Sequence, residues 1–130
     1  MGGKSMRGIG FYFFIAGVLC ITIGMFWGIQ MSITEDHTMS GAHAHLNLVG
    51  WVTMGLFSLY YTLTPSAAAS GLAKIHLAIA IAGVVVMVPG IVIALKQGGH
   101  GMAAAGSMLT AASMLVFLYT VFRHGLGKSA

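Results

Sequence analysis

Acidic side chains are nearly absent from this sequence, which holds only Glu35 and Asp36 among its 130 residues. Charged residues of both signs make up 6% of the chain and hydrophobic residues 58%, whereas soluble domains carry roughly 25% charged residues. This composition excludes a soluble domain and predicts an integral membrane protein.

Cysteine is equally scarce, since Cys20 is the only one in the chain. It lies within an apolar run, so neither a disulfide nor a cysteine-based metal site is available within one chain. Any metal site must therefore use histidine, of which there are six.

The basic residues are scattered singly between apolar segments instead of forming a patch for nucleic acid; they are Lys4, Arg7, Lys74, Lys96, Arg123 and Lys128. Such single residues are typical of topology signals. All except Lys96 lie in the amino terminus, the second loop or the carboxyl terminus. By the positive-inside rule, we expect both termini on the cytoplasmic side of the inner membrane.

The apolar runs predict an all-α membrane protein, because a crossing takes about 20 residues and this length leaves room for four helices. We expect a single transmembrane domain over residues 1–130, with helices at about 8–32, 42–63, 72–95 and 102–122. Pro65 should end the second helix, since proline has no amide donor and biases the preceding residue away from helix.

With this topology most histidines share one membrane face. The expected outer group is His37, His43, His45 and His100. On the inner side, His76 lies beside Lys74 and His124 beside Arg123. We expect these two at the inner lipid interface and assign them no function.

Small residues recur along the first helix, where Gly10, Gly17 and Gly24 have heptad spacing. Such faces let helix backbones approach closely in lipid. Two interpretations remain open, which are packing within one four-helix bundle and a subunit interface.

The second helix opens with His43 and His45 inside an apolar run, where an unpartnered polar group costs several kcal/mol. At about 100° per residue, these two positions point in nearly opposite directions and cannot chelate one ion together. Neutral imidazole binds iron, copper and zinc, and it is an axial ligand in heme proteins. The alternative is that one histidine bonds a backbone carbonyl or a water near the helix end.

The run from His43 to Met54, with Phe57, Tyr60, Tyr61 and Pro65, resembles the tenth helix of the catalytic subunit of heme-copper oxygen reductases, especially cbb-type oxidases and nitric oxide reductases. This resemblance implies that His43 matches the ligand of the high-spin heme and His45 the ligand of the low-spin heme. It covers about 25 of the 130 residues.

The resembled subunit has twelve helices in three arcs of four, so one chain here resembles one arc. A homotrimer would then mimic the whole subunit, with each interface receiving His43 from one chain and His45 from the next. The chain departs from the family in lacking the copper-ligand histidines of two other helices and acidic proton-channel residues. Proton-pumping oxygen reduction is therefore not implied, and whether the chain is an oxidoreductase stays open.

Three functions remain in view. The first is a heme b protein, with or without copper, that transfers electrons or binds a diatomic gas such as oxygen or nitric oxide. The second is a copper or heme carrier or assembly factor for a respiratory oxidase, in which the four outer histidines act with Met39 and Met102. The third is a structural subunit without cofactor.

Overall fold

The computed structural model describes residues 7–129, and Lys4 lies outside this range. The described residues form helices and no strands, in the order α1 (Ile9–Thr34), α2 (Ser40–His45), η1 (Leu46–Thr53), α3 (Met54–Leu63), α4 (Pro65–Ala68), α5 (Gly71–Leu95) and α6 (Gly101–His124). Elements α2, η1 and α3 continue one another and together form the second span, Ser40–Leu63.

Four of the described helices are long and apolar enough to cross a membrane: α1, the second span, α5 and α6. This confirms the predicted all-α chain with four membrane-spanning helices. Their ends lie within two residues of the expected ones. Pro65 does end the second span, and it then begins the short helix α4, where its missing amide costs no helical hydrogen bond.

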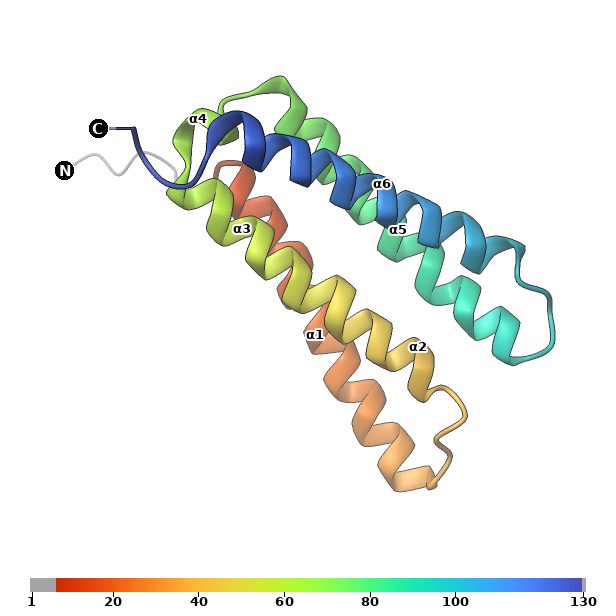
Figure 1. Cartoon of the computed structure of the whole chain (residues 1–130). Coiled ribbons are helices and arrows are strands. Elements are labelled where there is room, and N and C mark those ends of the chain that lie inside the picture. The colour runs from red at the N-terminus through yellow and green to blue at the C-terminus, as the bar shows by residue number, and fades with distance from the viewer. Residues whose placement is uncertain (1–6, 130) are drawn as a thin grey trace.

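The helices form two antiparallel pairs. Helix α1 packs along the second span, and α5 packs along α6, while α5 also contacts α1 and α2. Helix α1 begins and α6 ends at the same end of the molecule, and the loops that follow α1 and α5 lie at the other end (Figure 1). We call these the terminal end and the histidine end.

Glycines allow the close approach within each pair. Gly10, Gly17 and Gly24 are buried, and a Cβ built on them would meet Thr62, Trp51 and Asn47 of the second span. In the other pair, a Cβ on Gly106 would meet the backbone of Met87. The glycines of α1 therefore serve packing within one chain, which decides between the two interpretations left open by their spacing.

The core is richest in aromatic rings near the terminal end. Phe13 of α1 contacts Phe57 of α3 with ring centroids 5.5 Å apart, and Phe57 lies 4.6 Å from Phe117 of α6. His76 of α5 stands among these rings and is 0% exposed. The expectation that His76 lies at the lipid interface is therefore wrong.

Candidate histidine site

The second span changes its hydrogen-bond pattern directly after the two histidines. Leu46–Thr53 is a π-helix, in which each amide bonds the carbonyl five residues earlier. The Thr53 hydroxyl also donates to the Leu48 carbonyl, at 3.0 Å. Stretches of π-helix are rare and are often found at functional sites, and sequence reasoning gave no sign of this one.

His45 is the outward-facing histidine of the second span. Its side chain is exposed, and it lies above a stripe of exposed apolar side chains on the same span: Leu48, Val52, Leu56, Leu59 and Leu63. Its Nδ1 lies 2.7 Å from the Gly41 carbonyl oxygen. A carbonyl can only accept, so Nδ1 carries the hydrogen and Nε2 keeps its lone pair.

His43 faces α1 instead and is half-buried. Its Nε2 lies 2.9 Å from the Gly24 carbonyl oxygen, so this nitrogen donates. A Cβ built on Gly28 would stand 3.1 Å from the same nitrogen, and the indole of Trp27 lies edge-on with ring centroids 6.2 Å apart. The imidazole therefore packs against α1 where Gly24 and Gly28 have no side chains to exclude it.

Asn47 completes the contact between the second span and α1. Its Nδ2 lies 3.2 Å from His43 Nε2, while its buried Oδ1 has no partner among the described residues. Because His43 Nε2 already donates to Gly24, it cannot accept from Asn47. Turning the Asn47 amide by 180° lets Oδ1 accept a hydrogen bond from His43 Nε2, which this nitrogen then shares between Gly24 and Asn47. The oxygen thereby gains a partner.

The loop histidines His37 and His100 are exposed at the histidine end. In the described residues 7–129, no three His, Cys, Asp or Glu side chains lie close enough together to hold a metal ion. One chain therefore does not bring His37, His43, His45 and His100 into a metal centre.

A cavity of about 310 Å³ does lie at this end, lined by Trp27, Gln30, Met31, Thr34, Asp36, Met39, Val92 and Lys96. It contains Met39 of the copper hypothesis but none of the histidines. Hydrogen bonds from the Thr38 hydroxyl and amide lower the pKa of Asp36 below its ordinary value, so this loop carries a carboxylate at neutral pH.

His76 and Tyr61 form a polar pair that the sequence did not reveal. The Tyr61 hydroxyl lies 2.9 Å from His76 Nδ1, and both side chains are almost fully buried. Rings surround the imidazole, with centroids at 4.4 Å for Phe57 and 5.0 Å for Phe13. This packing leaves no room for a cofactor at His76.

Comparisons of the chain with protein-family models, with curated proteins and with solved structures find no match. The function must therefore be inferred from the second span, its two histidines and the residues around them.

Proposed function

We propose that this chain is a membrane-embedded heme b protein of the inner membrane, assembled as a homotrimer, that transfers electrons or binds a diatomic gas. The observation that carries the proposal is the state of His45. It combines an exposed ring, an Nδ1 hydrogen bonded to Gly41 and a free Nε2 lone pair at the head of an apolar stripe.

This arrangement is the one that metal-binding histidines use. Their second ring nitrogen commonly donates to a carbonyl or carboxylate, which fixes the tautomer and turns the free nitrogen toward the metal. The Gly41 carbonyl does so for His45. The remaining nitrogen, Nε2, is the one that could bind a metal, because Nδ1 is engaged with Gly41.

The stripe below His45 suits the ring of a porphyrin. Leu48 and Val52 follow at helical spacing and are both exposed. A groove of about 240 Å³ begins at Val52 and is lined by Phe14, Trp51, Val52, Gly55, Leu56 and Leu59. When bound, the heme iron would change its oxidation state by one electron or offer a coordination position to a gas. Leu48 and Val52, the part of the stripe nearest to His45, would border the porphyrin.

His43 differs from His45 because its Nε2 is already engaged within the chain. The resemblance to the tenth helix gives it a ligand role, yet its Nε2 donates to Gly24. To bind iron through that nitrogen, the ring must leave the Gly24 carbonyl. We therefore expect His43 to act as a second, separately controlled ligand, whose loss alters the spin state without abolishing heme binding at His45.

An absorption spectrum of the purified protein tests the proposal. We expect a Soret band that is lost or strongly reduced in His45→Ala, shifted in His43→Ala and unchanged in His124→Ala, the matched control at the terminal end. His76→Ala is unsuitable as a control because the residue is buried. A Soret band of normal height and position in the His45 variant would exclude the axial role of His45.

The copper or heme carrier remains the second candidate, because His37 and His100 are exposed in the loops at the histidine end, where Met39 lines a cavity. Histidine and methionine are suitable ligands for copper. Metal analysis of His37→Ala and His100→Ala separates the candidates. The carrier is favoured if the protein has no Soret band and its copper content falls in these variants. If both variants keep the metal content and the spectrum, His37 and His100 are ordinary loop residues.

A further inference from the structure

A cavity of about 430 Å³ lies at the terminal end between α1, α4 and α5, and it is lined by Arg7, Gly8, Ile9, Tyr12, Ala68, Lys74 and Leu77. Its volume lies within the range of about 300–1,000 Å³ typical of ligand sites. Arg7, Tyr12 and Lys74 are exposed, so the cavity opens to the surroundings of the protein. None of these residues belongs to the histidine site.

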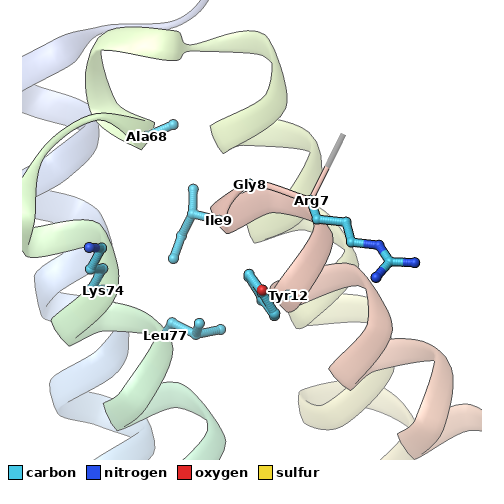
Figure 2. A pocket seen from close by; sticks show the side chains of 7 residues that line it. All are labelled: Arg7, Gly8, Ile9, Tyr12, Ala68, Lys74 and Leu77. Atoms are coloured by element: carbon cyan, nitrogen blue, oxygen red, sulfur yellow. The ribbon is translucent and has the colours of Figure 1, made fainter. Parts of the chain in front are cut away.

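The lining divides into a polar edge and an apolar floor. Figure 2 shows Lys74 on one side of the cavity, Ile9, Tyr12 and Leu77 in the middle, and Arg7 on the other side, with its side chain pointing away from Lys74. Lys74 lies in the first turn of α5, and Arg7 precedes α1, so both cations lie at the membrane–water boundary. The apolar side chains are Ile9 in the first turn of α1 and Leu77 one turn deeper in α5.

The two cations lack acidic partners within the chain. Its only carboxylate side chains, Glu35 and Asp36, belong to the loop at the opposite end. A second copy of the chain in the same orientation would place its own carboxylates at that opposite end as well. A carboxylate side chain of this protein therefore does not neutralise the two cations, which leaves them able to bind an anionic molecule.

We propose that this cavity binds one anionic phospholipid, such as phosphatidylglycerol, with its phosphate between Lys74 and Arg7 and an acyl chain on Ile9 and Leu77. Basic pockets between membrane helices on the cytoplasmic side bind such head groups. The Arg7 guanidinium lies over the Phe11 ring, 5.6 Å from its centroid, so contact with the phosphate requires Arg7 to change rotamer. A free phosphate would leave the apolar floor unused.

Native mass spectrometry of the purified, delipidated protein tests the site. The protein is mixed with equal amounts of dioleoyl phosphatidylglycerol and dioleoyl phosphatidylcholine, and the first bound lipid is counted. We expect phosphatidylglycerol to predominate and to lose about fivefold in affinity in Lys74→Gln and again in Arg7→Gln, since each cation near the surface contributes about 1 kcal/mol.

Lys96→Gln is the matched control, because it removes the same charge at the histidine end and should leave the preference unchanged. Ala68→Phe tests the cavity independently, since it keeps both cations but fills the space, and we expect loss of the first lipid. The circular dichroism spectrum and melting temperature must match those of the unsubstituted protein.

Three results would overturn the proposal. They are equal binding of the two lipids, an equal loss in Lys96→Gln and Lys74→Gln, and complete displacement of phosphatidylglycerol by millimolar inorganic phosphate. The last result would identify a plain anion site. Because none of the substituted residues lies in the second span or at the histidine end of that span, the outcome is independent of the heme proposal.

Discussion

The Tyr61 hydroxyl and His76 Nδ1 lie 2.9 Å apart inside the bundle, and His76 Nε2 has no partner among the described residues. One ring nitrogen of this histidine is thus satisfied by a single phenol. The aromatic rings of Phe13, Phe57 and Phe117 surround the pair. A polar pair inside an apolar cage makes the stability of the bundle depend on both members being present.

We expect Tyr61→Phe to lower the free energy of unfolding by about 1–3 kcal/mol, because it leaves both nitrogens of His76 buried without a partner. His76→Phe should also lower it, because the buried Tyr61 hydroxyl loses its partner, although a phenyl ring suits the cage and the unpartnered Nε2 is removed. In the double variant both polar groups are gone, which can be nearly neutral. Melting temperatures of the parent, the two single variants and the double variant in detergent measure the coupling between the two side chains.

A double variant as unstable as the sum of its parents would show that the two side chains are not coupled. Heme content offers a second check. The pair lies at the terminal end of the chain, away from His45, so we expect His76→Phe to keep the Soret band of the parent protein.

The error over His76 has a physical explanation. Because Lys74 lies only two residues away in the sequence, both side chains were expected at the lipid interface. Residues two apart on a helix point in nearly opposite directions, so an exposed Lys74 places His76 toward the core. The same geometry separates His43 from His45 on the second span.

The helices themselves could be predicted well, since four apolar runs of spanning length leave few alternatives and Pro65 stops the second one. The π-helix at Leu46–Thr53 could not, because a shift of hydrogen-bond register depends on how the span packs against α1. Glycine spacing likewise shows that a helix is closely approached, but it does not say by which neighbour. Gly24 meets Asn47 of the same chain, which only the structure shows.

The contact between α5 and α6 gives the next prediction. A Cβ on Gly106 would meet the backbone nitrogen and Cα of Met87, and backbone atoms cannot turn aside as a flexible side chain can. We expect Gly106→Ala to lower the free energy of unfolding by about 1–3 kcal/mol, the usual cost of overpacking. Thermal melting in detergent measures it.

Gly55→Ala is the control for this substitution. Gly55 also lies within a helix, but a Cβ there would meet nothing within 4 Å. The added methyl should leave stability unchanged or raise it slightly, because alanine is the better helix former. Equal losses in the two variants would mean that helix propensity, and not the contact with Met87, sets the cost.

The assembly itself gives the last prediction, a homotrimer. One chain offers His45 outward and His43 toward α1, so a heme held from two sides needs a histidine from another chain. Identical subunits joined head to tail form a closed ring when the rotation between neighbours adds up to a full turn. A ring of three such subunits has three equivalent interfaces. We expect native mass spectrometry to show a trimer, with heme lost from His45→Ala while the trimer mass persists.

Mixing variants tests whether the site is shared between chains. When His43→Ala and His45→Ala chains are produced together, every mixed trimer contains one interface at which an intact His43 faces an intact His45, because the contacts run head to tail. Mixed trimers should then recover about a third of the native Soret band at its native position, whereas His45→Ala alone lacks the band and His43→Ala alone keeps it only in shifted form. The shared site would be excluded by a monomer or dimer with full heme content, or by mixed trimers that recover no signal. His45 would then act as a ligand within its own chain.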